Sequence, residues 1–302
     1  MANYQAIIRL RPEVRDFIRH RRWVHRGDVI AYGPNIACDS FSTDGSGFRH
    51  STLGAETLSV HDCLQRPRYG LVMGPSNVYG FGLAGNDKTM PSLLAEHFGF
   101  PFANIGLPEG NSRSLYGLLT AFIARAPNPP AAVVHISGGD FTSYCYTGIA
   151  DAVFGPPNLK QIEMTLEERG GRPDAAVTMP PLLAFTSLWI RAIANLCKGH
   201  GIPLVLGNDT TFFEKRVPDD SDRQSGLGEP FNAAQARQFE THKRYLADYD
   251  ARRTALAAAL GVPLAGPGPS NQIGFVDEFH YDAAGTRALS DDFATAIEPL
   301  LS

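Results

Sequence analysis

Short apolar runs alternate along the chain with longer segments whose apolar residues recur at helical spacing. Each run is bounded by turn-forming residues and is too short for a helix, which is typical of a buried parallel strand. The predicted strands are residues 71–73, 102–105, 131–136, 203–206 and 262–265. The predicted helices are residues 90–98, 115–124, 182–196, 233–260, as one helix or two, and 282–300, for which Asp282 is the expected N-cap.

This alternation predicts an α/β fold in which a central parallel sheet of about five strands is covered by helices on both faces. We expect the α/β domain to span residues 67–302. Residues 1–66 do not follow the alternation, and we interpret them as an N-terminal extension packed on the core. Residues 147–180 are predicted to form an excursion over the active-site edge, and residues 213–228 a mobile loop.

An arginine-rich segment lies within the extension. Residues 9–26 hold seven arginines and two histidines, and Val14, Phe17 and Ile18 stand at helical spacing. The spacing predicts a short amphipathic helix. Its basic face is typical of a helix packed on the domain or at a subunit contact, and also of an arm that binds phosphate groups or a membrane surface.

Composition restricts the classes of function. The chain has 302 residues, of which 43% are hydrophobic, and a formal net charge of −4. So mild a charge does not indicate a nucleic-acid partner or an anionic membrane. Residues 182–196 are apolar, but their modest length and the interruption by Arg191 argue against a membrane span. The oligomeric state is not indicated.

Cysteines and the N-terminus indicate the compartment. The four cysteines are scattered without a CxxC pair, which argues against a zinc site and a dense disulfide frame. Residues 1–10 lack the apolar segment and small-residue cleavage site of a secretory signal. We therefore expect a cytoplasmic protein without a bound metal.

Nucleotide cofactors are not indicated either. The chain contains no GxxxxGK[ST] motif. Residues 80–85 match GxGxxG letter for letter, but they begin several residues after the predicted strand and lead into no immediate helix. We expect no cofactor.

Candidate chemistry begins with Ser76, which follows the first predicted strand in a glycine and proline turn. Ligands bind at the carboxyl ends of strands in open α/β sheets, so this hydroxyl is either a nucleophile or part of an ordinary strand-to-helix turn. Asp277 and His280 stand three residues apart before the last helix. That spacing lets a carboxylate orient an imidazole toward a nucleophile, although capping or surface positions are the common alternative.

Taken in order, four blocks carry a resemblance to a known family. They are Gly74-Pro75-Ser76, Gly106 after the second strand, Gly138-Gly139-Asp140 after the third, and Asp277-Glu278-Phe279-His280 before the last helix. Over residues 69–300 this order resembles the SGNH, or GDSL-type, hydrolases. The resemblance implies a flavodoxin-like three-layer α/β/α sandwich and acyl-ester chemistry. Gly47-Phe48-Arg49 also resembles the lead-in of members linked to bacterial surface-polysaccharide chemistry.

The resemblance implies a role for each matching residue. Ser76 would attack the acyl carbon, His280 would take and return its proton, and Asp277 would orient His280. The backbone N–H groups of Ser76 and Gly106 would meet the oxyanion. The remaining candidates for oxyanion or substrate binding are Gly138, Asp140 and Asn77.

Two residues depart from the family pattern. Asp140 stands where the family has an oxyanion-hole asparagine, and an ionised carboxylate accepts hydrogen bonds but donates none. It is expected to be protonated, to bind a cationic substrate group, or to mark a site that no longer hydrolyses. Pro75 replaces the usual aspartate and removes a backbone N–H.

These observations favour a serine-dependent esterase or deacetylase that acts on a small or carbohydrate ester through an acyl-enzyme on Ser76. Two alternatives stay open. One is an O-acyltransferase that passes the acyl group to a sugar or small-molecule hydroxyl. The other is a binding protein that retains the fold and uses Asp140 to hold a cationic ligand.

Overall fold

The structure is a computed structural model of the 302-residue chain. It describes residues 8–9, 11, 13–20, 24–26, 29–108, 110–137, 140, 175–207, 220, 233–266, 273–277 and 279–302. The predicted loops at 147–180 and 213–228 therefore lie mostly outside the described residues, as do Gly138 and Glu278.

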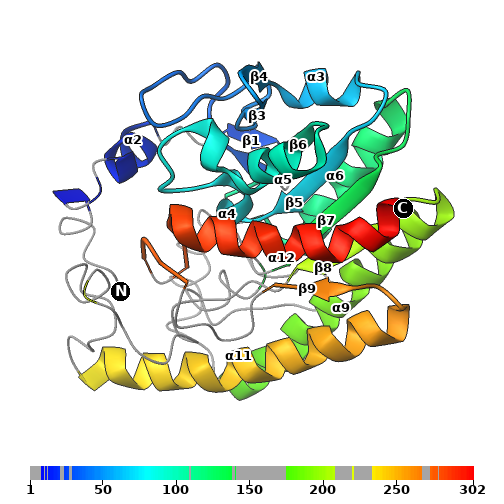
Figure 1. The fold of residues 1–302 in the computed structure, drawn as a ribbon. Coiled ribbons are helices and arrows are strands. Elements are labelled where there is room, and N and C mark those ends of the chain that lie inside the picture. The colour runs from blue at the N-terminus through cyan, green and yellow to red at the C-terminus, as the bar shows by residue number, and fades with distance from the viewer. Residues whose placement is uncertain are drawn as a thin grey trace.

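A five-stranded parallel sheet forms the centre of the molecule (Figure 1). Its strands are β5 (Gly70–Gly74), β6 (Phe102–Gly106), β7 (Ala132–Ile136), β8 (Leu204–Gly207) and β9 (Leu264–Ala265). They lie in the order β6-β5-β7-β8-β9, which is the order of flavodoxin-like sheets. Each residue of the first four strands is buried, as continuous apolar runs predict. The predicted fold class is confirmed.

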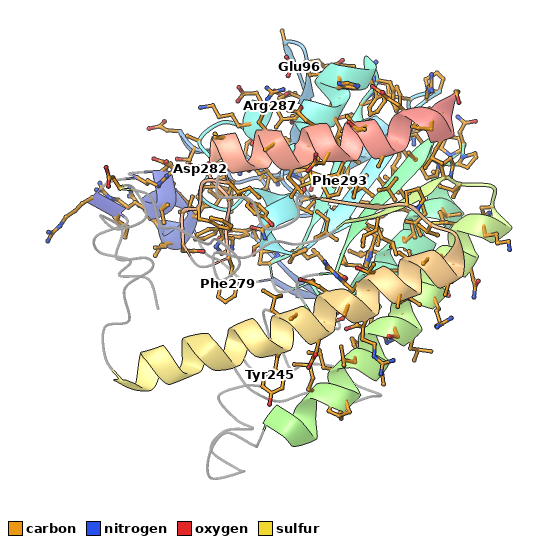
Figure 2. All side chains as sticks on the ribbon, turned by 60° about the horizontal axis from the view of Figure 1, so that its bottom comes forward. Glu96, Tyr245, Phe279, Asp282, Arg287 and Phe293 are labelled. Atoms are coloured by element: carbon orange, nitrogen blue, oxygen red, sulfur yellow. The ribbon has the colours of Figure 1, made fainter. Side chains whose placement is uncertain are left out.

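Helices cover both faces of the sheet, which gives three layers. On one face, α5 (Met90–Phe98) and α12 (Ala283–Leu301) pack on Val72, Val134 and Val205. On the other, the interior is shared by residues of α3 (Val60–Leu64), α6 (Ser112–Arg125), α9 (Ala175–Gly199) and α11 (Ala233–Leu260). Figure 2 shows Phe293 of α12 on the sheet side of that helix, and Arg287 bonds Glu96 of α5 at 3.2 Å.

The predicted helices that pack on the sheet begin and end within three residues of their expected bounds, except for α9. Asp282 caps α12 as predicted, because its side chain accepts a hydrogen bond from the backbone N–H of Gly285. The segment 233–260 is a single helix. However, α9 begins at Ala175 rather than at 182, and it continues through Pro180 and Pro181. Proline usually marks a boundary because it lacks an N–H, so the sequence places the start too late.

The amphipathic helix predicted for residues 9–26 is wrong in extent. Helix α2 covers only Glu13–Arg19, and β1 (Val24–Arg26) then pairs antiparallel with β2 (Val29–Ala31). Val14 and Phe17 are fully buried, whereas Ile18 is 39% exposed. The apolar stripe therefore supports only two turns of helix, and the β-branched residues that follow favour strands.

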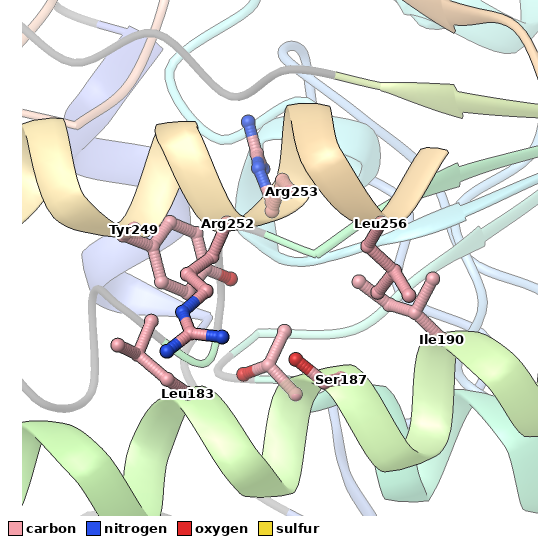
Figure 3. Close-up of a pocket in the computed structure, with 8 residues that line it drawn as sticks. Leu183, Ser187, Ile190, Tyr249, Arg252, Arg253 and Leu256 are labelled. Carbon is pink, nitrogen blue, oxygen red and sulfur yellow. The ribbon is translucent and has the colours of Figure 1, made fainter. Parts of the chain in front are cut away.

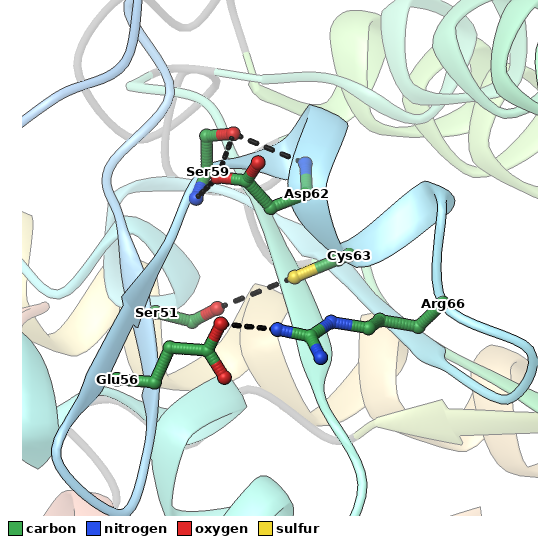
Figure 4. Close-up of polar contacts among 6 residues, drawn as sticks. All are labelled: Ser51, Glu56, Ser59, Asp62, Cys63 and Arg66. Atoms are coloured by element: carbon green, nitrogen blue, oxygen red, sulfur yellow. Dashed lines mark hydrogen bonds and ion pairs between the residues drawn. The ribbon is translucent and has the colours of Figure 1, made fainter.

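The remainder of the extension forms a hairpin and a short helix before the sheet. Strands β3 (Ser51–Leu53) and β4 (Glu56–Leu58) pair antiparallel, and Ser59 and Asp62 form a capping box at the start of α3. Figure 4 shows Glu56 of β4 bonded to Arg66, and Ser51 of β3 bonded to Cys63 of α3. The hairpin packs beside α5. A domain boundary at residue 66 stays a prediction.

Candidate active site

Ser76 lies at the point where the central strand β5 ends and a short helix begins. Helix α4 (Ser76–Tyr79) starts directly after the N-cap residue Pro75. As the first helical residue, Ser76 has a backbone N–H without an acceptor inside the helix. Gly80 ends α4 in the left-handed conformation at φ 83°, which other residues rarely adopt. The sharp reversal leaves the Ser76 hydroxyl at the carboxyl edge of the sheet, where such folds bind ligands.

Three of the predicted site residues form one hydrogen-bonded chain. The hydroxyl oxygen of Ser76 lies 2.7 Å from Nε2 of His280. The other ring nitrogen of His280, Nδ1, lies 2.7 and 2.8 Å from the two carboxylate oxygens of Asp277. An Nδ1–H held by a carboxylate leaves Nε2 as the acceptor, so this arrangement can take a proton from Ser76.

Asp277 is held as an anion by its surroundings. Its side chain is almost fully buried, and Oδ1 accepts hydrogen bonds from the backbone N–H groups of Phe279 and His280, both at 2.9 Å. Burial by itself would raise the pKa of Asp277. The charge of His280 and these hydrogen bonds outweigh burial, so that the pKa of Asp277 lies below its usual value.

The loop that carries Asp277 and His280 is fixed at both ends. Val276 donates its backbone N–H to the carbonyl of His280 at 2.7 Å. The backbone N–H of Asp282 donates to the carbonyl of Gly274 at 3.0 Å. Phe279 packs in an apolar cluster with residues of α9 and α11, among them Tyr245 (Figure 2). Helices α9 and α11 therefore hold the loop that carries the imidazole.

Gly106 lies beside α4, but its N–H is engaged. A Cβ at this position would overlap the backbone N and Cα of Tyr79, so only glycine lets α4 pack so closely on β6. The N–H of Gly106 donates to the side-chain oxygen of Asn104 at 2.9 Å, a contact that the sequence does not predict. An oxyanion role for Gly106 stays a prediction.

Asp140 faces two helices. Its carboxylate accepts from the backbone N–H of Ser112 at 2.9 Å, from the Ser112 hydroxyl at 2.6 Å and from the Thr186 hydroxyl at 3.1 Å. Full burial raises the pKa of Asp140 to about 6, although these donors act in the opposite direction. The contacts join the end of β7 to α6 and α9.

Of the other candidates, Asn77 is the second residue of α4 and is 6% exposed. Gly138 lies outside the described residues. The residue that ends β7 on this side, Ser137, is held by α11: its carbonyl accepts from the Tyr249 hydroxyl at 2.7 Å, and its hydroxyl accepts from Arg253 at 3.2 Å.

Arg49 binds the turn that follows α4, a role that the sequence pattern does not predict. Its guanidinium is fully buried and donates to the carbonyls of Gly80, Leu83 and Gly85 at 2.5, 2.9 and 2.9 Å, and to the side chain of Asn86 at 3.0 Å. Burial lowers the pKa of Arg49 to about 10, which still leaves it charged at neutral pH. A cation thus organises the turn that follows the Ser76 helix.

A small cavity lies between α9 and α11, and it is separate from Ser76. Its lining includes Leu183, Ser187 and Leu256 (Figure 3). Arg252 reaches across it toward α9, whereas Arg253 leaves α11 on the other side. Its volume of about 10 Å³ is the space of a single water molecule. This cavity cannot hold an ester substrate.

A metal site and a membrane-spanning helix are both absent from the described part of the chain. No group of three or more His, Cys, Asp and Glu side chains there is arranged to hold a metal ion. Among the helices that are described, none has both the length and the apolar composition needed to cross a bilayer.

Comparison with known proteins gives a likeness of fold. No family model matches the sequence, and no curated protein matches it. Similar solved structures include a GDSL-like lipase from Bacteroides thetaiotaomicron, which is 16% identical, covers 77% of this chain and 88% of its own, and has a TM-score of 0.47.

Two further structures are alike to a similar degree. A carbohydrate acetylesterase family member from Sinorhizobium meliloti is 16% identical, with 78% of this chain and 99% of that chain covered and a TM-score of 0.47. A member of the lipolytic protein G-D-S-L family from Veillonella parvula is 12% identical, with 76% and 98% covered and a TM-score of 0.48. The descriptions of the Bacteroides and Veillonella proteins include the GDSL designation. At these scores the likeness assigns no residue a role.

Proposed function

We propose that the protein is a serine-dependent acyl hydrolase, an esterase or deacetylase that acts on a small or carbohydrate ester. The observation that carries this proposal is the continuous hydrogen-bonded chain from Ser76 through His280 to the buried Asp277. The sequence separates Ser76 from His280 by 204 positions, so this contact exists only because the fold brings two distant loops together.

The reaction would follow from this geometry in two halves. The Ser76 oxygen attacks the acyl carbon while its proton passes to Nε2 of His280. The tetrahedral intermediate then expels the alcohol, which takes the proton from His280, and an acyl-enzyme remains. A water molecule attacks that ester with His280 as general base, and the acid leaves as Ser76 recovers its proton.

Asp277 contributes by orientation and charge. It holds Nδ1–H so that Nε2 faces Ser76, and its negative charge stabilises the imidazolium that forms in each half-reaction. The low pKa of Asp277 supports this role, since the carboxylate stays ionised when His280 is protonated.

The oxyanion would be met first by the backbone N–H of Ser76, which has no acceptor within α4. Gly106 joins it only if Asn104 turns away, because Asn104 now accepts that N–H. We assign Asp140 a supporting role: its bonds to Ser112 and Thr186 favour a structural link over the cation site of a binding protein.

Covalent labelling tests the proposal. Wild type, Ser76→Ala and, as a control, Ser290→Ala of α12 are treated with a fluorophosphonate and their intact masses are measured. We expect one adduct on the wild type and on Ser290→Ala, and none on Ser76→Ala. An unlabelled wild type with a native melting transition, or an adduct that survives in Ser76→Ala, contradicts the proposal.

The acyl acceptor is tested on the same proteins. Acetylated sugars and nitrophenyl esters of increasing chain length are supplied with and without a free sugar. Release of acid at a rate independent of the sugar supports hydrolysis. Acyl sugar formed at the expense of acid would instead favour the O-acyltransferase.

A further inference from the structure

Phe81 touches both halves of the proposed catalytic pair. Its backbone N–H donates to the carbonyl of Ser76 at 3.0 Å. Its ring lies against the imidazole of His280, with the ring centres 4.4 Å apart and the planes inclined by 36°. One residue is therefore tied to the nucleophile through its backbone and to the general base through its side chain.

Two glycines allow Phe81 to occupy this place. Gly80 and Gly82 flank it with φ of 83° and 79°, a region that side-chain-bearing residues rarely enter. A Cβ on Gly82 would come within 3.1 Å of Val276, the residue before Asp277. The Gly-Phe-Gly turn is thus wedged between the helix of Ser76 and the loop of His280.

Behind Phe81 lies the N-terminal helix α2. The ring centre of Phe17 is 5.2 Å from that of Phe81, and Phe17 also stacks on Phe41 at 4.4 Å. Phe17 is fully buried. Three aromatic rings therefore lie in series from the extension to the edge of the site: Phe17, Phe81 and His280.

A second contact links the same two regions. Arg11, just before α2, bonds the carboxylate of Asp282 at 3.3 Å. Asp282 stands two residues after His280 and caps α12 (Figure 2). The N-terminal segment thus meets the histidine loop by an ion pair and, through Phe81, by an aromatic stack.

We propose that Phe81 and Phe17 are positioning residues of the active site, so that α2 is a working part of the catalytic centre rather than a separate appendage. The inference rests on the proposed function. Phe81 holds the imidazole over Ser76, and Phe17 holds Phe81. The free energy that an aromatic contact of this kind contributes to a ring orientation is equivalent to a roughly two- to tenfold change in rate.

The competing interpretation is that these rings are only part of the hydrophobic core of the extension, together with Tyr32 and Tyr79. A purely structural role predicts that a smaller side chain lowers stability and leaves His280 in place. A positioning role predicts a change at His280 itself, and its recovery when the ring is restored.

The test uses the full-length chain with Phe81→Leu, Phe81→Tyr and Phe17→Leu. The matched control is Phe98→Leu, since Phe98 packs on Phe100 and Phe102 away from the site. Two quantities are measured. One is the rate at which the Nδ1–H proton of His280 exchanges with water, followed through its downfield NMR signal, which is assigned by its absence in His280→Gln. The other is the rate constant for labelling of Ser76 by a fluorophosphonate, with melting curves to show that each variant is folded.

We expect Phe81→Leu to speed exchange of the His280 Nδ1–H proton with water, because an imidazole without its aromatic neighbour leaves Asp277 more often, and to slow labelling by about two- to tenfold. Phe81→Tyr should retain both properties, and Phe17→Leu should show a smaller change in the same direction. Phe98→Leu should change neither. The inference is overturned if Phe81→Leu leaves both unchanged, or if Phe98→Leu alters them equally.

Failure of the proposed function would look different. If Ser76 is not labelled in the wild type, the exchange rate of the His280 Nδ1–H proton alone decides, because it reports how firmly the ring is held without any catalysis. Exchange that speeds up in Phe81→Leu and not in Phe98→Leu supports the positioning contact, and exchange that is unchanged in Phe81→Leu overturns it.

Discussion

Two buried aspartates in this protein have pKa values displaced in opposite directions. Asp277 lies beside His280 and two backbone N–H donors, which keep it ionised in spite of burial. Asp140 accepts hydrogen bonds from the neutral donors of Ser112 and Thr186, and burial raises its pKa to about 6, although these donors and the charge of Arg253 act in the opposite direction. An aspartate side chain is thus kept ionised at position 277, beside the histidine, and titrates near pH 6 at position 140, after β7.

A stability measurement across pH tests the assignment for Asp140. In the unfolded chain its pKa is close to the ordinary 3.8, and in the folded chain it is about 6. Between these values the folded state retains a proton that the unfolded state releases. The contribution of Asp140 to stability therefore falls as pH rises from about 4 to about 6, by at most about 3 kcal/mol at 1.36 kcal/mol per pKa unit.

Asp140→Asn removes this titration. We expect the free energy of unfolding of the variant, relative to that of the wild type, to increase as pH rises from about 4 to about 6, because only the wild type loses stability in this range. Urea unfolding at a series of pH values measures the difference. Asp248→Asn, at an exposed position of α11, is the control. Parallel pH curves for wild type and Asp140→Asn would contradict a raised pKa.

At the scale of elements, the position of the proposed nucleophile Ser76 depends on how closely α4 packs on β6. Gly106 permits that packing, because any side chain there would collide with the backbone of Tyr79. The short helix cannot shift without carrying Ser76 with it, since Ser76 is its first residue. The spacing between one helix and one strand therefore sets the distance from Ser76 to His280.

Gly106→Ala is expected to separate stability from activity. The added methyl group should lower the free energy of unfolding by about 1–3 kcal/mol, as overpacking does. Labelling of Ser76 should slow by at least about tenfold, because a shift of about 1 Å in a catalytic group is that costly. Gly117→Ala in α6, where a Cβ meets nothing within 4 Å, is the control and should be neutral or stabilising. Equal labelling rates for the two variants would contradict the argument.

Elements could be predicted from the sequence wherever local pattern decides them. The strands of the sheet are mainly apolar runs, interrupted by Asn104 in β6 and His135 in β7, and the Gly-x-Ser and Asp-x-x-His motifs single out the residues that the fold brings together. The helix predicted at 9–26 fails because strand pairing competes with a weak apolar stripe. The partners of Asp140 and Gly106 were missed because they depend on side-chain directions that no spacing reveals. The catalytic roles themselves stay proposals.

At the scale of the whole molecule, Arg49 joins the N-terminal region to the turn behind Ser76. Its donors satisfy carbonyls of Gly80, Leu83 and Gly85 that are otherwise without strand or helix partners. Because a guanidinium presents five donors in one plane, no other side chain can bind so many acceptors at once. The residues before position 66 and those after it are thereby held as one unit.

Arg49→Met should remove the guanidinium donors from the buried carbonyls of Gly80, Leu83 and Gly85, of which that of Gly80 still accepts from the N–H of Leu83, and lower the free energy of unfolding by about 3 kcal/mol or more. The free energy of unfolding of Arg49→Lys should lie between those of Arg49→Met and the wild type, because an ammonium reaches fewer of the carbonyls than a guanidinium does. Urea unfolding provides the measurement. The control is Arg66→Met, which breaks only an exposed pair with Glu56 and should cost less than about 1 kcal/mol. Similar losses for Arg49→Met and Arg66→Met would refute the argument.

The 204 positions between Ser76 and His280 also have a consequence in time. While the chain is being synthesised, the ribosome has delivered Ser76, Phe81 and the first strands long before the histidine emerges. Until then the Ser76 hydroxyl lacks its proposed base, His280. Chains are synthesised at about 5–20 residues per second, so the interval between Ser76 and His280 lasts about 10–40 seconds. If the proposed chemistry holds, the chain cannot form an acyl-enzyme or hydrolyse an ester while it is being synthesised, and its activity begins only after His280 has emerged.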